Sequence, residues 1–238
     1  MINADVSNFS IKGPGKAESE DAIIGGLQVA GGVLFAVADG LGGQPAGDVA
    51  SKTALVGLGL GLGIAGKPDF DAGFRQATRA LVEKTRTQPG TRGMATTISA
   101  VFIKDTRAHV GHAGDSRIYH IHRGEIEQIT KDQTRARQMV DAREMTPTEA
   151  LHDDRRHLLH SVVSARGKYE LEKAHFTVEQ GDRILLFTDG VYNLIDEAEL
   201  LELSDNSVEI EGFSEAICLR INAMGAVDDA TAVCVEIE

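Results

Sequence analysis

Two apolar segments that each end in Asp-Gly place the strongest constraint on the fold of this chain. Residues 35–38 (Phe-Ala-Val-Ala) lead into Asp39-Gly40, and residues 185–188 (Leu-Leu-Phe-Thr) lead into Asp189-Gly190. An apolar run stopped by Asp-Gly indicates a buried strand that ends in a sharp turn, because glycine permits close approach of the backbone. Each segment therefore predicts a carboxylate at the end of a core strand. The alternative for a single copy is a simple turn, but two copies favour a shared role.

Two further acidic clusters also adjoin apolar strands. Residues 18–21 (Glu-Ser-Glu-Asp) precede an Ala-Ile-Ile run, and Asp228-Asp229 leads into the apolar residues 232–235. An acidic pair is often only a solvated loop end, and this alternative stands for each cluster taken alone. Carboxylates crowded together repel one another unless a cation lies among them, and Mg²⁺ and Mn²⁺ prefer oxygen ligands. Brought together, the clusters predict a site for hard cations.

Short acidic or glycine-containing motifs follow one another along the chain. They are Glu20-Asp21, Asp39-Gly40-x-Gly42-Gly43, Gly114-Asp115-Ser116-Arg117, Thr130-Lys131-Asp132, Thr188-Asp189-Gly190 and Asp228-Asp229-x-Thr231. In this order they resemble the metal-dependent Ser/Thr protein phosphatases of the PP2C (PPM) family, bacterial type. The resemblance extends from about residue 9 to the C-terminus. Six motifs in the family's order are far more specific than any one of them.

Hydrophobic periodicity predicts runs of strands and pairs of helices, which favours an α+β class. Strands are expected at 9–13, 22–30, 33–38, 95–103, 108–113, 117–122, 125–129, 170–178, 182–188 and 232–235, and helices at 46–64, 69–87, 197–203 and 213–223. Arg123-Gly124 is expected to form a tight turn. Glycines at 57, 59, 61 and 63 lower the propensity of the first helix, and close packing against a sheet is the expected compensation.

The resemblance supplies the architecture that periodicity leaves open. It implies a four-layer α-β-β-α sandwich, in which two antiparallel sheets pack face to face and helices flank them. A single phosphatase domain is expected over residues 1–238, since a chain of this length is ordinary for one domain. A small flap subdomain is expected at about residues 133–168.

The resemblance also implies a centre that holds two Mn²⁺ or Mg²⁺ ions. Asp39 is expected to bridge the ions, with the Gly40 carbonyl as a further ligand. Asp189 and Asp228 are expected to bind the first ion, and Glu20 to reach the second. Such a pair of ions generates a strong nucleophile at neutral pH and neutralises charge on phosphoryl oxygens.

Other motif residues are expected near this centre. Asp21 is expected to orient water at the ions, and Asp132, together with Asp189, to form a third and weaker metal site. Asp115 and Arg117 resemble a structural pair that supports the site and takes no part in catalysis.

Lys16 and Ser19 depart from the family pattern Arg-x-x-Asn-Glu-Asp. If Lys16 occupies the phosphate-binding position, it offers a point charge where arginine offers two parallel hydrogen bonds. The alternatives are a solvated Lys16 and phosphate binding by an arginine of segment 135–166. Ser19 only partly replaces the hydrogen bonding of an asparagine.

Segment 131–168 is the least acidic part of an acidic protein. It contains Lys131, Arg135, Arg137, Arg143, His152, Arg155, Arg156, His157, His160, Arg166 and Lys168. A basic lid would attract acidic, phosphorylated protein segments. The alternative is a solvated helix pair whose charges have no specific role. The histidines are interpreted as structural or surface residues, because they lack a transition-metal ligand pattern.

The net charge of −12 and the pI of about 5.1 argue against nucleic acid and anionic membranes as partners. The first twenty residues lack the apolar region of a signal peptide, and residues 53–66 are too short and glycine-rich for a membrane span. Cys218 and Cys234 provide no disulfide framework, so a reducing cytoplasm is the expected compartment and a monomer the expected state.

The expected function is hydrolysis of phosphoserine and phosphothreonine in proteins, opposing a partner Ser/Thr kinase. The alternative is a pseudophosphatase or regulatory binding module that keeps the fold with little turnover. A calcium-loop protein is disfavoured, because no loop places several ligands within a dozen residues.

Overall fold

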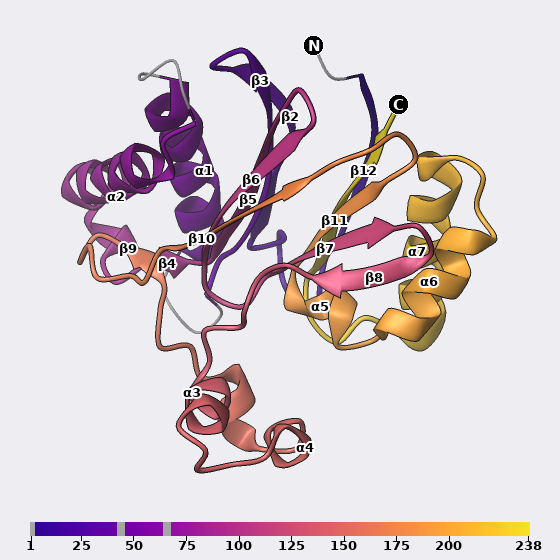
Figure 1. Cartoon of the computed structure of the whole chain (residues 1–238). Coiled ribbons are helices and arrows are strands. Elements are labelled where there is room, and N and C mark those ends of the chain that lie inside the picture. Colours follow the sequence, from indigo (N-terminus) through magenta and orange to yellow (C-terminus); the bar gives the residue numbers. More distant parts are fainter. Residues whose placement is uncertain (1–2, 42–45, 64–67) are drawn as a thin grey trace.

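The computed structural model describes residues 3–41, 46–63 and 68–238 (Figure 1). Its centre consists of two antiparallel sheets of five strands each. The first sheet has the order β1 (Ala4–Ile11), β12 (Ala230–Ile237), β11 (Arg183–Phe187), β7 (Arg117–His122) and β8 (Glu125–Gln128). The second has the order β10 (Glu172–Thr177), β6 (Arg107–Ala113), β5 (Ile98–Lys104), β3 (Gly32–Asp39) and β2 (Asp21–Val29). Two short strands, β4 (Ala95–Thr96) and β9 (Val163–Ser164), pair separately.

Helices cover the outer faces of both sheets (Figure 1). The second sheet is covered by α1 (Gly47–Gly63) and α2 (Phe70–Thr87), and the first by α6 (Glu197–Asp205) and α7 (Ile210–Met224). Buried apolar residues form one cluster between the sheets and one under each pair of helices. This arrangement confirms the expected α-β-β-α sandwich. Within the described ranges, no helix is long and apolar enough to cross a membrane.

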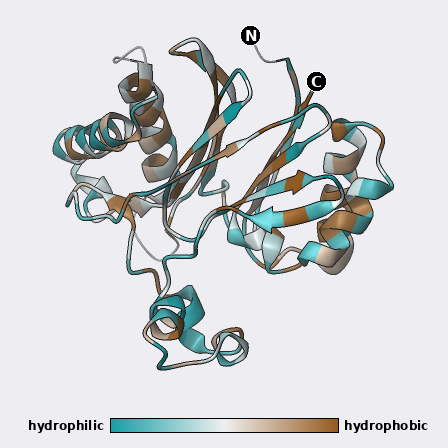
Figure 2. Cartoon of the chain, in the orientation of Figure 1, coloured by the Kyte–Doolittle hydropathy of each residue, from teal (hydrophilic) through white to brown (hydrophobic). Residues whose placement is uncertain are grey.

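The strands β3, β5 and β11 are largely apolar because both of their faces are buried. In β3, Phe35 and Val37 point into the space between the sheets, whereas Leu34 and Ala36 pack under the helices α1 and α2. Figure 2 shows the resulting hydrophobic strands at the centre of the molecule. Polar residues appear where these strands leave the core, which places the Asp39 carboxylate at a strand end.

Most predicted elements are confirmed with small changes of boundary. The strand predicted at 117–122 is β7, and the turn after it has positive φ at Arg123 (52°) and Gly124 (78°). The first strand was predicted too late, because β1 pairs with β12 from Ala4 onward. The strand predicted at 95–103 is divided into β4 and β5. The end of the first predicted helix, at residue 64, lies outside the described residues.

The glycines of α1 serve a different contact from the one predicted. A Cβ at Gly57 would lie 2.6 Å from the Cα of Ala77, and a Cβ at Gly61 would lie 2.7 Å from the Cα of Gly73. Both neighbours belong to α2, so these glycines allow two helices to approach each other, not a helix and a sheet. Gly59 alone meets the sheet, through Leu27 of β2, and Gly63 faces open space.

The segment between β8 and β9 projects from the sandwich (Figure 1). It contains α3 (Arg135–Asp141), α4 (Pro147–Ala150) and a 3₁₀ turn (Asp154–His157), each begun by a capping side chain, from Thr134, Thr146 and Asp153. In these three helical pieces only Ala136 is buried. Helix caps and local hydrogen bonds therefore stabilise these pieces more than burial of apolar side chains does. Their surface is mostly hydrophilic in Figure 2.

The helix contact can be tested with a matched pair of alanine substitutions. Gly61→Ala should lower the free energy of unfolding by about 1–3 kcal/mol, because the added methyl group overlaps the α2 backbone. Gly63→Ala should leave it unchanged or raise it by up to about 1 kcal/mol, because alanine has the higher helix propensity. Denaturant unfolding of both variants measures the difference. Equal effects would contradict the assigned contact.

Candidate metal centre

The ends of β2 and β3 bring two acidic motifs side by side. Asp21 lies directly opposite Asp39 in the antiparallel register. The Gly40 N–H donates to the Glu20 carbonyl at 3.1 Å. Asp39 is held from the other side by Thr97, whose hydroxyl accepts from the Asp39 N–H and whose own N–H donates to the Asp39 carbonyl, both at 2.9 Å. The backbone thus fixes two carboxylates next to each other.

Glycines are required where other segments approach these strand ends. A Cβ at Gly40 would overlap the Gly47 carbonyl and lie 2.7 Å from the Glu20 carbonyl oxygen. A Cβ at Gly47 would collide with the Glu20 carboxylate, so the first turn of α1 lies against that side chain. Gly190 has the same role at the other sheet, because its Cβ would overlap the Asp229 carbonyl. Gly40 and Gly190 therefore allow close packing. The sharp turns expected at the two Asp-Gly pairs are not seen, because Gly40 forms a bridge with Thr96 and Asp189-Gly190 begins helix α5.

Asp21 is buried, and only one of its two carboxylate oxygens has a hydrogen-bond partner. Its Oδ2 accepts a hydrogen bond from the Thr188 hydroxyl at 2.8 Å, which links the two sheets. Its Oδ1 is buried without a hydrogen-bond partner. Burial, opposed by hydroxyl hydrogen bonds and assisted by the charges of Asp229 and Asp189, raises the pKa of Asp21 to about 7. A buried carboxylate oxygen without a partner is costly, so this position calls for a donor or a cation.

Asp39 and Asp189 belong to the same electrostatic cluster. Burial and the neighbouring carboxylates of Asp21 and Asp189 raise the pKa of Asp39 well above its ordinary value. Burial and the charge of Asp228 raise the pKa of Asp189. Asp189 begins the short helix α5 (Asp189–Tyr192), directly after β11. The fold therefore gathers carboxylates predicted from both sheets into one repulsive group.

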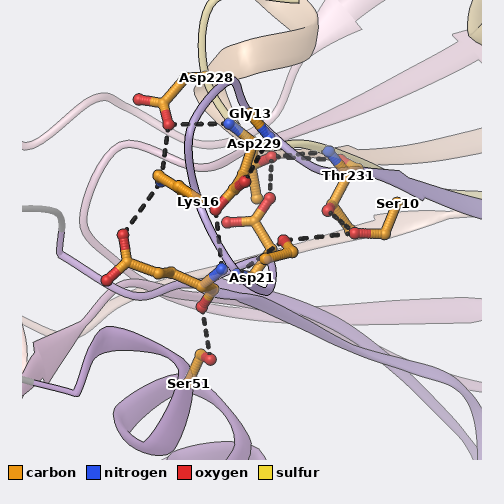
Figure 3. Close-up of polar contacts among 11 residues, drawn as sticks. Ser10, Gly13, Lys16, Asp21, Ser51, Asp228, Asp229 and Thr231 are labelled. Atoms are coloured by element: carbon orange, nitrogen blue, oxygen red, sulfur yellow. Dashed lines mark hydrogen bonds and ion pairs between the residues drawn. The ribbon is translucent and has the colours of Figure 1, made fainter.

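Lys16 lies among the carboxylates (Figure 3). Its Nζ is 2.9 Å from Asp228 Oδ1, 2.9 Å from Asp229 Oδ2 and 3.0 Å from Glu20 Oε2. Burial alone would lower the pKa of Lys16. Hydrogen bonds to these carboxylates outweigh burial and raise the pKa above its ordinary value, so the ammonium stays charged. Lys16 is thus not a solvated loop residue, and it partly neutralises two predicted metal ligands, Glu20 and Asp228.

Asp229 is a structural residue that the sequence interpretation did not assign. It is 3% exposed, against 54% for the Asp228 side chain, so the two neighbours have different roles. The Asp229 carboxylate accepts from the N–H groups of Gly13 and Glu20, both at 2.7 Å, and from Lys16 (Figure 3). It therefore ties the loop after β1 to the strand β12. The position of Asp229 directly before a buried strand was the one sequence signal that could have indicated this structural role.

Arg117 pairs with Asp132, and the two residues form a second support next to the cluster. Its Nε and Nη2 donate to the two Asp132 oxygens at 3.0 and 2.7 Å, and its guanidinium lies 3.8 Å from the centre of the Tyr192 ring. Burial, with the charges of Asp189 and Asp132, raises the pKa of Asp115 to about 8. The supporting role of Asp115 and Arg117 stays a prediction. The Asp132 carboxylate is occupied by the guanidinium.

A cavity of about 870 Å³ opens beside these residues, between the sandwich and the projecting segment. Its lining includes Asp115, Arg117, Asp132, Arg156, His157 and Tyr192. Several basic residues of segment 131–168 form ion pairs with acidic residues of the same segment. Lys131 and Arg137 pair with Asp141, and Arg155 pairs with Asp153. Arg156 instead donates to the Leu151 carbonyl and to His157. The cavity therefore combines cationic and acidic walls.

The donors of the cluster fit hard divalent cations. They are carboxylate oxygens, and no soft ligand is among them. The Gly40 carbonyl stays a predicted ligand. The unpartnered Asp21 Oδ1 and the raised carboxylate pKa values indicate an excess of negative charge that Lys16 does not fully offset. Mn²⁺ or Mg²⁺ would relieve this repulsion.

The pH dependence of stability tests the repulsion in metal-free protein. Because the folded-state pKa of Asp21 is about 7, the folded state keeps a proton that the unfolded chain loses near pH 4. Stability should therefore fall as the pH rises from about 4 to about 7, and Asp21→Asn should reduce this slope. Thermal melts in chelator across this range measure it. An identical slope in the variant would contradict the assignment.

Comparison with known proteins agrees with this geometry. The family model described as protein phosphatase 2C matches residues 16–226. The serine/threonine protein phosphatase PstP of Mycobacterium tuberculosis is 31% identical over 236 residues, which cover 96% of this chain and 44% of PstP. The chain thus spans less than half the length of that relative. Protein phosphatase PhpP of Streptococcus pneumoniae is 24% identical, with 95% of each chain covered.

Solved structures give the same result. The crystal structure of the Mycobacterium tuberculosis phosphatase PstP/Ppp matches with a TM-score of 0.86 and 29% identity, over 99% of both chains. The catalytic domain of PstP in complex with two manganese ions matches with a TM-score of 0.80 and 29% identity, over 98% of both chains. From the family match, the shared sandwich and the acidic centre, we conclude that this chain belongs to the protein phosphatase 2C family.

Proposed function

We propose that the chain is a metal-dependent phosphatase that hydrolyses phosphoserine and phosphothreonine in proteins. The observation that carries this proposal is the crowding of Asp21, Asp39, Asp189 and Asp228 at the adjoining ends of two sheets, with a buried carboxylate oxygen left unpartnered. Membership of the protein phosphatase 2C family supports the reaction class. The names of PstP and PhpP, both protein phosphatases, support a phosphoprotein as substrate.

Two ions, Mn²⁺ or Mg²⁺, are the proposed cofactors. Asp39, the Gly40 carbonyl, Asp189, Asp228 and Glu20 would hold them. When bound, such ions supply a strong nucleophile at neutral pH and positive charge beside the phosphoryl oxygens. Asp21 would accept a hydrogen bond from the attacking water through its unpartnered Oδ1 and so orient it. Thr188 keeps the Asp21 side chain in place for this role, through its hydrogen bond to Oδ2.

Lys16 is the proposed contact for the substrate phosphate. Its ammonium now bonds to Glu20, Asp228 and Asp229. Ions that neutralise Glu20 and Asp228 would weaken two of these bonds and release the ammonium toward a phosphate group. Asp229 would remain as the anchor, because its carboxylate is fixed by two backbone N–H groups.

A third ion at Asp132 stays a prediction of the family resemblance. The bidentate contact with Arg117 engages both oxygens of Asp132, so an ion there would lie beside a guanidinium charge that repels it. This contact favours a centre of two ions. The third site would be weak for the same reason.

The cavity of about 870 Å³ is the proposed place for the substrate chain. It runs from Asp115 and Arg117 on the sandwich to Arg156 and His157 on the projecting segment. This segment is the proposed flap, and its basic groups would attract an acidic, phosphorylated peptide. A Ser/Thr kinase and its targets are the proposed partners. A pseudophosphatase is the second candidate, since Lys16 and Ser19 replace the family's Arg and Asn.

Removal of a central carboxylate tests the catalytic role of the centre. Asp39→Asn and Asp189→Asn should each lower the rate of phosphopeptide hydrolysis with Mn²⁺ at least about a hundredfold, because nucleophile and charge neutralisation are lost together. Calorimetric titration of Mn²⁺ should show weaker binding in both variants.

Asp105→Asn is the matched control, since Asp105 lies in the β5–β6 turn with φ of 52°, which asparagine tolerates. It should retain full activity. Wild-type protein that hydrolyses no phosphopeptide with either metal would favour the pseudophosphatase. Full activity after complete chelation would contradict the metal mechanism.

Two substitutions of Lys16 test its contact with phosphate. Lys16→Arg should lower the KM for a phosphopeptide, because a guanidinium matches phosphate oxygens through two parallel hydrogen bonds. Lys16→Ala should raise the KM more than it lowers kcat. Steady-state kinetics at saturating metal separates the two parameters. If both variants match the wild type, Lys16 does not contact the phosphate, and an arginine of the flap takes its place as the candidate.

A further inference from the structure

A second group of potential metal ligands lies outside the acidic centre. His120 and His122 project from the same face of β7, two residues apart, and both contact Asp182, which precedes β11. His120 Nε2 is 2.8 Å from Asp182 Oδ2, and His122 Nδ1 is 2.6 Å from Asp182 Oδ1. One ligand atom from each of the three residues lies within 4.8 Å of the others. Two imidazole nitrogens thus converge on one carboxylate.

The surroundings hold these three side chains in place. Asp182 is 3% exposed, and its Oδ2 also accepts the Glu179 N–H at 2.9 Å. The His120 ring packs against Phe176 of the second sheet, with ring centres 4.5 Å apart, and against His122 at 5.5 Å. Burial alone would raise the pKa of Asp182. Hydrogen bonds from the Glu179 N–H and the two histidines outweigh burial and lower this pKa. The group therefore offers one buried carboxylate and two oriented imidazoles.

This group is separate from the acidic centre. Arg117 and Asp189 lie at one end of β7 and β11, whereas His122 and Asp182 lie at the other end of the same strands. In Figure 1 the β7–β8 turn lies at the opposite end of β7 from α5. Five residues of strand separate Arg117 from His122, which corresponds to about 17 Å at about 3.3 Å per residue. The two groups cannot share an ion.

Solvent reaches the histidine group through a cavity. The cavity has a volume of about 450 Å³ and includes His122 and Asp182 in its lining. Two arginines also line it, but Arg123 pairs with Glu179 at 2.8 Å and Arg183 with Glu236 at 2.7 Å. Their positive charges are therefore offset locally, and the carboxylate of Asp182 remains to attract a cation.

We propose that His120, His122 and Asp182 bind one transition-metal ion of the zinc type. Two imidazoles and one carboxylate suit Zn²⁺, Ni²⁺ or Cu²⁺, whereas Mg²⁺ prefers oxygen ligands alone. On binding, each neutral imidazole places its proton on its other ring nitrogen, and the ion takes the position between the nitrogens and Asp182. Water from the cavity completes the coordination.

The role of this ion is structural. It joins the end of β7 to the residue before β11, the neighbouring strand of the same sheet, at the end remote from the acidic centre. An ion bound only in the folded state stabilises that state by mass action. The site takes no part in the phosphatase reaction, so it does not depend on the proposed function.

Calorimetric titration of Zn²⁺ into chelator-stripped protein tests the site. Saturating Mg²⁺ is kept present to occupy the oxygen ligands of the acidic centre. Wild type should bind one Zn²⁺ and melt at a higher temperature with it, and X-ray absorption at the zinc edge should show imidazole ligands. His122→Ala should weaken Zn²⁺ binding at least about tenfold and abolish the rise in melting temperature. His122 is partly exposed, so this variant should still fold.

His175→Ala is the matched control. His175 faces His109 across β6 and β10, with ring centres 6.4 Å apart, on exposed surface. This variant should bind Zn²⁺ as the wild type does. Asp182→Asn provides a second test, because asparagine has nearly the same size as aspartate but no charge. This variant should also bind Zn²⁺ more weakly. Equal Zn²⁺ affinity in wild type, His122→Ala and Asp182→Asn would overturn the proposal, as would zinc absorption spectra with oxygen ligands alone.

Discussion

Repulsion between buried carboxylates is the constraint on which the rest of the centre depends. The antiparallel register of β2 and β3 sets Asp21 opposite Asp39, and the packing of the two sheets adds Asp189 from the end of β11. Each of these groups loses hydration on folding and gains like-charged neighbours, and both effects disfavour ionisation. Positive charge that enters the cluster relieves this repulsion, so the way the core is built favours the binding of a cation.

Lys16 and Asp229 show how the protein itself limits this repulsion. Lys16 supplies one positive charge from the loop after β1, and Asp229 fixes that loop through the backbone N–H groups of Gly13 and Glu20. Asp229 can remain ionised because two N–H groups and an ammonium surround it, and these contacts lower its pKa despite burial. The same loop then carries Glu20 to the cluster. Structural support and the proposed phosphate contact thus reside in one short segment.

The two ends of the sandwich differ in their chemistry. At one end, carboxylate oxygens form the proposed centre for hard cations. At the other end, His120, His122 and Asp182 form a group suited to a softer ion. The strands β7 and β11 contribute to both ends, so packing between the sheets fixes both groups without requiring them to interact.

The sequence by itself determined the class of fold and most of the acidic centre. Buried strands such as β3 and β11 are mostly apolar runs, and the Asp-Gly pair that follows each run places a carboxylate at the strand end. Order and spacing of the motifs then identified Asp39, Asp189 and Asp228 as members of one family pattern. Local signals sufficed because chain direction and turn chemistry are properties of neighbouring residues.

Only the tertiary structure decided which distant residues meet. Gly57 and Gly61 of α1 contact α2 and not a sheet, because helix packing depends on which faces come together and not on composition. The buried role of Asp229, the pairing of Arg117 with Asp132 and the three carboxylates around Lys16 join residues from separate elements. His120, His122 and Asp182 likewise converge across two strands, 60 or more residues apart in sequence. Such contacts depend on the register of strand pairing and the packing of layers, which no single stretch of sequence encodes.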